Sequence, residues 1–309
     1  YDKNLDGKKI LDLGCDNGIT TCFIANLYPN SEIIGVDKCK KGIKCAEEIA
    51  QKLGVENVKF EAVDAKKVDK FFKEEKFDLV ISNRSMLEIT NLPKLKSFWS
   101  IDEVENSIVV ANSVLKFFKS VEKVMTNDAK LITFERLDGL EEILNFIKSM
   151  HASGLYADTD AMCKIQFNEL NDVEQMPLIV FDKTERDEIG FYDAIEIYNK
   201  LPILNKQKDI EDEFAIELQF KALGEKELVY GTQIDYKTGV GSERREVWKV
   251  GDKYVTYKYS NVGRRELVTE GIEKDKAINE IRAMSNFIGR IGHKVTEYHS
   301  IEEREKLVK

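Results

Sequence analysis

The stretch Ile10–Gly18, which reads ILDLGCDNG, places the tightest restriction on how this chain can fold. Three apolar residues, Ile10, Leu11 and Leu13, lead directly into glycine and small polar residues. This pattern is typical of a buried strand that ends in a tight turn, where a ligand can lie against bare main chain. The pattern of residues 19–27 then predicts a helix. Taken alone, the motif fits any α/β protein in which a strand ends at a glycine turn.

Chain length and charge restrict the class of protein further. A chain of 309 residues predicts two domains, and its 42% hydrophobic residues suffice for an ordinary core. No apolar run approaches the roughly 20 residues that span a bilayer, and no charged leader with an apolar centre is present. The first residue is Tyr1 rather than Met, which allows for a removed segment. The net charge of −9 disfavours a bulk electrostatic grip on nucleic acid.

The five cysteines show no C-x-x-C spacing, and the chain has only three histidines. An odd number of cysteines without paired spacing is typical of a reducing compartment and argues against a structural zinc. We therefore expect a cytoplasmic protein with no metal site and no contact with a membrane.

Three more apolar segments follow at regular spacing, and acidic residues close two of them. Asp37 ends the first of these segments, and Asp64 follows the second. Strands that alternate with helices indicate a parallel sheet with helices on both faces, in which the carboxyl ends of the strands line one crevice. An acidic residue in this crevice can accept both hydrogens of a ribose diol. The three predicted strands are Glu32–Asp37, Val58–Ala62 and Phe77–Ser82, with a helix at Lys41–Leu53 after the first.

This ordered set of motifs resembles that of class I S-adenosylmethionine-dependent methyltransferases, over about residues 1–184. The family's glycine turn runs G-x-G-x-G, and here Asp16 stands where the middle glycine is usual. The resemblance implies a doubly wound, mostly parallel, Rossmann-like sheet of seven strands that closes with an antiparallel hairpin at Lys164–Leu170 and Pro177–Asp182. A nicotinamide dehydrogenase is the alternative, but it expects G-x-G-x-x-G, which this turn does not provide.

The resemblance also implies which residues bind the cofactor, S-adenosylmethionine. Asp12 and the turn Gly14–Gly18 would hold its methionine part, Asp37 its ribose hydroxyls, and Asp64 with Ala65 its adenine. The full set of candidates is Asp12, Gly14, Cys15, Asp16, Gly18, Asp37, Lys38, Asp64, Ala65 and Ser82.

The acceptor side carries a weaker signal. Methyltransferases that act on the exocyclic amines of DNA bases resemble an Asn/Asp-Pro-Pro-aromatic pattern after the fourth strand, whereas this chain has Ser82-Asn83-Arg84-Ser85. We take Asn83, Arg84 and Ser85 as the catalytic candidates. Arg84 either meets an acidic substrate or forms an ion pair with Glu88 one turn further on.

An apparent insertion, Leu92–Ile108, follows this acceptor segment. Its aromatic pair, Phe98 and Trp99, either forms part of a lid over the crevice or packs as an ordinary aromatic pair.

The second half of the chain has a different pattern. Residues 185–212 are predicted to be a charged linker with a helix at Ile189–Leu201. Alternating apolar and polar residues then predict strands, beginning with Phe214–Lys221, and a turn at Gly251-Asp252 predicts a hairpin. The expectation for residues 213–309 is a small α+β domain, an antiparallel meander backed by the single helix Asp275–Ile291.

Two features of this second domain bear on its partners. Arg244-Arg245 and Arg264-Arg265, with Trp248, Tyr254, Tyr257 and Tyr259 between them, form either a basic-aromatic surface for single-stranded nucleic acid or a solvated strand face with its aromatics on the core side. The segment Glu246–Met284 is also faintly similar to WGR domains, although Tyr259-Ser260-Asn261 replaces the defining Trp-Gly-Arg.

The sequence therefore predicts an active methyltransferase that transfers a methyl group to an unidentified acceptor. The C-terminal domain is expected to recognise the substrate or a nucleic-acid or protein partner. Two alternatives stay open: a non-catalytic binding protein that kept the fold, and a nucleic-acid methyltransferase guided by the C-terminal domain.

Overall fold

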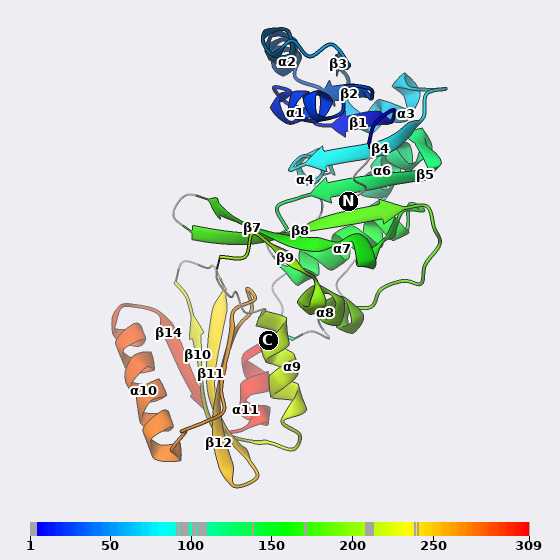
Figure 1. Ribbon diagram of the computed structural model, residues 1–309. Helices are drawn as coiled ribbons and strands as arrows, with labels where there is room; N and C mark the ends of the chain where they lie inside the picture. The colour runs from blue at the N-terminus through cyan, green and yellow to red at the C-terminus, as the bar shows by residue number, and fades with distance from the viewer. Residues whose placement is uncertain are drawn as a thin grey trace. The chain divides into compact units, whose positions relative to one another are not determined.

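A computed structural model describes residues 5–90, 92, 99–100, 103, 110–137, 139–169, 172–207, 213–237, 239 and 241–308. The chain divides into two compact units (Figure 1). The first takes residues 1–94 and 108–209, and the second takes residues 95–107 and 210–309. The assignment of separate roles to residues 1–184, 185–212 and 213–309 stays a prediction.

One mixed sheet forms the centre of the first unit. In the described residues it has nine strands, eight of them in the order β3-β2-β1-β4-β5-β8-β7-β9, and β6 pairs with β8. The first five strands run parallel, whereas β8 is antiparallel to both β5 and β7. The predicted doubly wound, mostly parallel fold with its closing hairpin is confirmed, and two strands of two residues each extend it beyond seven. The strands are β1 (Lys9–Leu13), β2 (Glu32–Asp37), β3 (Val58–Ala62), β4 (Phe77–Asn83), β5 (Met125–Phe134), β6 (Tyr156–Ala157), β7 (Cys163–Glu169), β8 (Asp172–Asp182) and β9 (Ile203–Leu204).

Helices connect these strands in two groups. Helix α1 contacts α2, whereas α6 contacts α3 and α7, and α7 contacts α8; Figure 1 shows α1 with α2 apart from α6 with α7. Helix α2 illustrates why they form, because Ile43, Ala46 and Ala50 bury one face and Gly54, at φ +66°, ends it. The bounds are α1 (Ile19–Leu27), α2 (Lys40–Leu53), η1 (Ala65–Lys67), α3 (Val68–Phe71), α4 (Met86–Thr90), α6 (Asn112–Val124), α7 (Leu140–His151), η2 (Thr159–Ala161) and α8 (Phe191–Lys200).

The second unit is an antiparallel sheet with helices on both faces. Its strand order is β13-β12-β11-β10-β14, and the predicted turn at Gly251-Asp252 joins β11 to β12. Helix α10 contacts β10, β11 and β14, while α9 contacts β13; Figure 1 shows α10 on one side of this sheet and α9 and α11 on the other. The elements are α9 (Glu213–Ala222), β10 (Glu227–Asp235), β11 (Ser242–Val250), β12 (Lys253–Ser260), β13 (Arg265–Val268), α10 (Lys274–Arg290), β14 (Lys294–Tyr298), α11 (Ile301–Glu305) and η3 (Lys306–Val308).

The strand predicted at Phe214–Lys221 is wrong, because these residues form part of helix α9. The buried side chains are those of Ile216, Glu217 and Phe220, which recur at the helical period rather than at every second residue. The expected single helix of this unit is therefore joined by α9 and by the short α11, and strand β14 was not predicted. No helix in the described part of the chain has both the length and the apolar character that a membrane span requires.

Candidate active site

The register of the first sheet brings the predicted strand ends to one edge. Leu13 is the register partner of Val36, Asp37 that of Ala62, and Asn83 that of Phe134. Because all these strands run parallel, the residues that follow β1, β2, β3, β4 and β5 meet at this carboxyl edge.

The glycine turn after β1 is set by backbone conformations that favour glycine. Gly14 and Gly18 have φ values of +75° and +73°. A Cβ on Gly14 would lie 2.4 Å from Cβ of Ser85, and a Cβ on Gly18 would lie 2.6 Å from Cβ of Ala46. Both glycines are thus required by close packing as well as by backbone geometry.

Asp16, at the position of the family's middle glycine, also adopts a left-handed conformation, with φ +47°. Aspartate tolerates this region better than most residues, so the turn keeps its shape without the glycine. The amide of Asp16 donates a hydrogen bond to Oδ2 of Asp37 at 3.3 Å. This backbone bond, which a glycine at position 16 could donate equally, ties the turn to the end of β2.

Asp12 carries a buried carboxyl group inside β1, with 2% of the residue exposed. Its Oδ2 accepts a hydrogen bond of 2.6 Å from the Thr21 hydroxyl of α1. Burial raises the pKa of Asp12 to about 6, although the bond from Thr21 opposes this and the neighbouring charge of Asp37 adds to it.

Asp37 lies at the end of β2 and is partly exposed. Besides the amide of Asp16, its carboxylate accepts a hydrogen bond of 2.7 Å from the amide of Cys39. Lys38, the next candidate, is exposed. The carboxylate of Asp37 is thus fixed in direction while part of it faces solvent.

Three carboxylates surround the buried thiol of Cys15. Burial first, and then the charges of Asp12, Asp37 and Asp16, raise the pKa of this thiol well above its usual range. None of these three aspartates forms an ion pair with any residue that the structure describes. A concentration of negative charge without a protein cation suits a ligand that carries positive charge. S-adenosylmethionine carries a positive sulfonium and a positive ammonium group, and it therefore fits this set of carboxylates.

Asp64 and Ala65 lie just beyond β3. The side chain of Asp64 is exposed and caps η1, accepting a hydrogen bond of 3.1 Å from the amide of Lys66. Ala65 is buried. The structure therefore brings both to the edge that Asp37 occupies, because Val63 donates its amide to the carbonyl of Asp37.

The acceptor candidates follow β4. Asn83 is exposed, and Arg84 adopts a left-handed φ of +56°, which is uncommon for a residue other than glycine. The guanidinium of Arg84 lies 5.0 Å from the ring centroid of Phe167 and 5.8 Å from that of Phe134. The ion pair with Glu88 that the sequence suggested stays a prediction.

Ser82 and Ser85 point inward rather than toward solvent. The Ser82 hydroxyl is buried and lies 2.8 Å from that of Ser85, which also contacts the carbonyl of Leu13 at 2.5 Å. Oε1 of Glu135, a residue without an assigned role, lies at hydrogen-bond distance, 2.8 Å, from the Ser82 hydroxyl. Its place directly after β5, like that of Asp64 just beyond β3, was the signal that could have revealed it.

Of the two aromatic residues proposed as part of a lid, Phe98 and Trp99, the structure describes Trp99. Phe98 lies outside the described residues, whereas Trp99 belongs to the second unit. There its ring centroid lies 4.0 Å from the guanidinium of Arg244 and 5.8 Å from the ring of Tyr259. Trp99 is therefore packed against side chains of the second unit.

The basic-aromatic residues of the second unit do not form one surface. Arg244 and Arg265 are 4% and 6% exposed, and Trp248, Tyr257 and Tyr259 are buried. Nε of Arg244 donates to Gln233, and Nε of Arg265 pairs with buried Glu217 at 3.0 Å. The aromatics lie in the core, as the second alternative predicted, but Arg244 and Arg265 are buried with them, so these two arginines do not form a solvated strand face.

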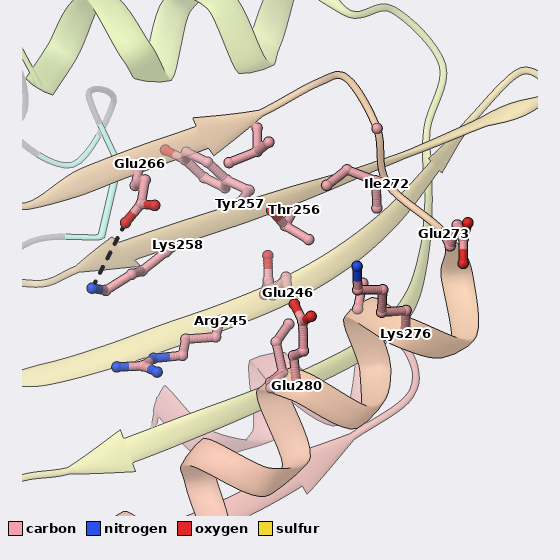
Figure 2. Close-up of a pocket in the computed structure, with 14 residues that line it drawn as sticks. Arg245, Glu246, Thr256, Tyr257, Lys258, Glu266, Ile272, Glu273, Lys276 and Glu280 are labelled. Carbon is pink, nitrogen blue, oxygen red and sulfur yellow. Dashed lines mark ion pairs between the residues drawn. The ribbon is translucent and has the colours of Figure 1, made fainter.

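This unit also holds a cavity of about 410 Å³ between α10 and strands β11 to β13 (Figure 2). Its charged side chains are of both signs, with Lys258 and Glu266 3.9 Å apart. This lining selects neither an anion nor a cation. The side chains that contribute charge to it are those of Arg245, Lys258, Glu266, Glu273, Lys276 and Glu280.

Comparisons with known proteins place the first unit in a family. The model of a methyltransferase domain matches residues 4–159, half of the chain. The chain is 31% identical over 126 residues to the release factor glutamine methyltransferase of Buchnera aphidicola, covering 38% of this chain and 44% of that protein. It is 32% identical over 89 residues to ribosomal RNA small subunit methyltransferase G of Porphyromonas gingivalis, covering 29% and 38%. The chain thus spans less than half the length of these two relatives.

Among solved structures, a putative methyltransferase from Thermoplasma acidophilum is similar with a TM-score of 0.42 and 12% identity, over 58% of this chain and 69% of that one. The family model, which covers half of the chain, agrees with the order of the motifs in the sequence. The chain belongs to the class I S-adenosylmethionine-dependent methyltransferases, whose cofactor is S-adenosylmethionine.

Proposed function

We propose that this chain is an active methyltransferase whose cofactor lies at the carboxyl edge of the first sheet. The observation that carries the proposal is the set of three carboxylates, Asp12, Asp16 and Asp37, around the glycine turn, none of which has an ion-pair partner among the residues that the structure describes. S-adenosylmethionine supplies the methyl group when it is bound.

Individual roles for the candidates follow from their positions. Asp12 and the turn Gly14–Gly18 would face the positively charged methionine part, since negative charge accumulates there. Asp37, fixed by two backbone amides, would accept hydrogen bonds from a ribose diol. Asp64 and Ala65, just past β3, would lie against the adenine.

The acceptor is expected to bind near Asn83, Arg84 and Ser85, which follow the neighbouring strand. Methyl transfer needs chiefly correct positioning and the exclusion of water, and a base only where the acceptor must lose a proton early. The fixed guanidinium of Arg84, held on two aromatic rings, supports a role in orienting the acceptor.

The second unit is proposed to recognise the acceptor or a partner. Its support is that Trp99, which comes shortly after the acceptor segment in the chain, packs on Arg244 of the second unit. We expect Trp99→Ala to reduce methyl incorporation from labelled S-adenosylmethionine into protein or RNA of a cell extract. Equal incorporation by the variant and the wild type would contradict this role.

Calorimetric titration with S-adenosylhomocysteine tests the cofactor site. The wild type is expected to bind in the micromolar range, and Asp37→Ala to lose about 2 kcal/mol, roughly 30-fold in affinity, because hydrogen bonds to a carboxylate contribute about this much. Asp128→Ala, an exposed aspartate at the other end of β5, is the matched control and should bind normally.

Two outcomes would change the proposal. The absence of binding by the wild type would contradict the cofactor site. Binding without transfer to protein, ribosomal RNA or small acceptors would favour the alternative of a binding protein that kept the fold. The names of the relatives make release factors and small-subunit ribosomal RNA the first acceptors to test.

A further inference from the structure

The carboxyl group of Glu135 joins three elements at the acceptor side of the edge. The residue is 1% exposed, and its Oε1 lies 2.8 Å from the Ser82 hydroxyl and 3.2 Å from the amide of Met86. Its Oε2 lies 3.5 Å from the amide of Leu87. Glu135 thus connects the end of β5 to the end of β4 and the start of α4.

The contacts continue from Ser82 to the glycine turn. The hydroxyls of Ser82 and Ser85 lie 2.8 Å apart, and the Ser85 hydroxyl lies 2.5 Å from the carbonyl of Leu13. Leu13 immediately precedes Gly14, whose missing side chain makes room for Ser85. A row of oxygen atoms therefore runs from Glu135 to the turn that faces the cofactor.

The number of protons decides how this row is bonded. Three oxygen-to-oxygen contacts, Glu135 to Ser82, Ser82 to Ser85 and Ser85 to Leu13, each need one proton between their atoms. The two serine hydroxyls supply two protons, and a backbone carbonyl supplies none. A third proton is available only if the carboxyl group of Glu135 carries it.

We propose that Glu135 is a positioning residue that acts as a neutral carboxylic acid. Its proton is donated to the Ser82 hydroxyl, Ser82 donates to Ser85, and Ser85 donates to the carbonyl of Leu13. This directed chain holds the acceptor loop, which carries Asn83, Arg84 and Ser85, against the cofactor turn. The inference rests on the proposed function of this edge.

The electrostatic surroundings of Glu135 agree with this geometry. Burial raises its pKa to about 7, and the bond that Ser82 can donate to the ionised form, together with the amides of Met86, Leu87 and Ser85, opposes this rise. The titratable and charged side chains near the junction, on the elements around it, are Asp12 on β1, Arg84 after β4, Glu88 on α4 and Arg136 after β5. A carboxyl group in this environment keeps its proton below neutral pH and loses it above.

Loss of the proton has a defined structural consequence. The ionised carboxylate accepts from Ser82, so either the Ser82–Ser85 contact or the Ser85–Leu13 contact is left without a proton. Ser85 is then no longer held from both sides, and the turn beside Gly14 becomes less ordered. Affinity for S-adenosylhomocysteine should therefore fall as the pH rises through about 7.

The first experiment needs no ligand. The side-chain carboxyl resonances of glutamate are followed by carbon-13 NMR, and the signal missing from Glu135→Gln identifies this group. We expect it to titrate near neutral pH, and Glu74→Gln, a substitution of the same kind at an exposed residue, should leave the Glu135 signal in place. Titration of the Glu135 signal at the ordinary glutamate pKa would overturn the proposal.

The second experiment measures affinity for S-adenosylhomocysteine at about pH 6.5 and about pH 8.5 by calorimetry. The wild type should bind about tenfold more weakly at the higher pH. Glu135→Gln keeps a fixed proton donor toward Ser82, so its affinity should stay within about threefold of the wild type at low pH and not fall at high pH. Glu135→Ala and Ser85→Ala should bind S-adenosylhomocysteine weakly at both pH values.

Failure of the proposed function and failure of the positioning role of Glu135 give different results. A wild type that does not bind S-adenosylhomocysteine contradicts the proposed function, and the NMR titration then still decides the protonation of Glu135. A wild type that binds with the same pH profile as Glu135→Gln overturns the positioning role alone. The nearby Asp12 remains unchanged in both proteins, so its own titration near pH 6 cancels in this comparison.

Discussion

The two units bury acidic side chains in opposite ways. In the second unit Glu246 is fully buried in the sheet, and its carboxylate accepts hydrogen bonds from Trp248, Tyr259 and Tyr298 at 2.8–3.0 Å. In the first unit Asp12 has one hydroxyl partner and lies where strands end. A buried carboxylate whose bonding capacity is filled by protein stabilises the fold, whereas one with free capacity at a strand end indicates a ligand site.

Removing Glu246 should have the largest effect on stability and none on the cofactor site. Glu246→Ala is expected to lower the unfolding free energy of the second unit by about 4 kcal/mol, because it leaves three buried donors and Arg304 without their acceptor. Urea denaturation followed by tryptophan fluorescence measures this, since both tryptophans, Trp99 and Trp248, belong to that unit. Glu227→Ala, an exposed residue of β10, is the control. A loss of S-adenosylhomocysteine affinity in Glu246→Ala would contradict the claim that Glu246 serves the stability of the second unit alone.

The glycine turn should respond next most strongly. Gly18→Ala is expected to cost about 3 kcal/mol, because its Cβ would lie 2.6 Å from Ala46 and 2.7 Å from Phe60. Gly54→Ala is matched in backbone conformation, at φ +66° with open space around it, and should cost only about 1 kcal/mol. Thermal unfolding measures both, and equal shifts in Tm would show that close packing at Gly18 is unimportant.

The pH dependence of the unfolding free energy should report on two buried carboxyl groups at the carboxyl edge of the first sheet, those of Asp12 and Glu135. Asp12 and Glu135 have pKa values raised to about 6 and about 7, so the native state binds more protons than the unfolded state between about pH 4 and those values. Each unit by which a pKa is raised corresponds to about 1.4 kcal/mol, so the unfolding free energy should fall by roughly 5 kcal/mol as the pH rises from about 4 to about 7. Glu135→Gln should make this fall smaller in a series of urea titrations, and an unchanged slope would contradict the account.

Asp182 should act in a different pH window. Burial alone would raise its pKa, but hydrogen bonds from Arg186 and Lys130 outweigh this and hold the pKa below its ordinary value of 3.8. The stabilisation from these bonds is therefore present above about pH 4 and is lost as the pH falls further. Because the two pH ranges differ, Asp12 and Glu135, whose pKa values are raised, can be measured separately from Asp182, whose pKa is lowered.

The smallest effect is expected at Arg245, on the other face of β11 from Glu246. Its guanidinium pairs with Glu243 at 2.5 Å, and its side chain is 18% exposed. Arg245→Ala should cost only about 1 kcal/mol, because Glu243 keeps Lys258 at 3.7 Å and the Tyr236 hydroxyl at 3.2 Å as partners. It should change the affinity for single-stranded RNA less than about twofold. A large, salt-dependent loss of RNA affinity would instead support the alternative of a basic-aromatic surface that binds single-stranded nucleic acid.

The same contrast explains what could be predicted from the sequence. In the first unit the strands at Glu32–Asp37 and Val58–Ala62 and the helix at Ile19–Leu27 have the predicted bounds, because buried parallel strands and amphipathic helices produce strong periodic patterns. In the second unit, helix α9 was predicted as a strand because it buries the charged residue Glu217 against Arg265. A buried ion pair of this kind cannot be recognised from hydrophobic periodicity.

The candidate site shows a similar division. The acids and glycines of the turn were predicted because they follow strands at regular spacing. Glu135 was not assigned a role, because its partners Ser82 and Met86 lie about fifty residues away and depend on the pairing of β4 with β5. Residues that act through such long-range hydrogen bonds leave little trace in local sequence.

Amide hydrogen exchange with and without S-adenosylhomocysteine tests the central claim most directly. The account predicts added protection in residues 14–18, 37–39 and 64–66, which follow β1, β2 and β3, and no change in β10–β12 of the second unit. Protection confined to the second unit would contradict the assignment of the cofactor to the carboxyl edge of the first sheet.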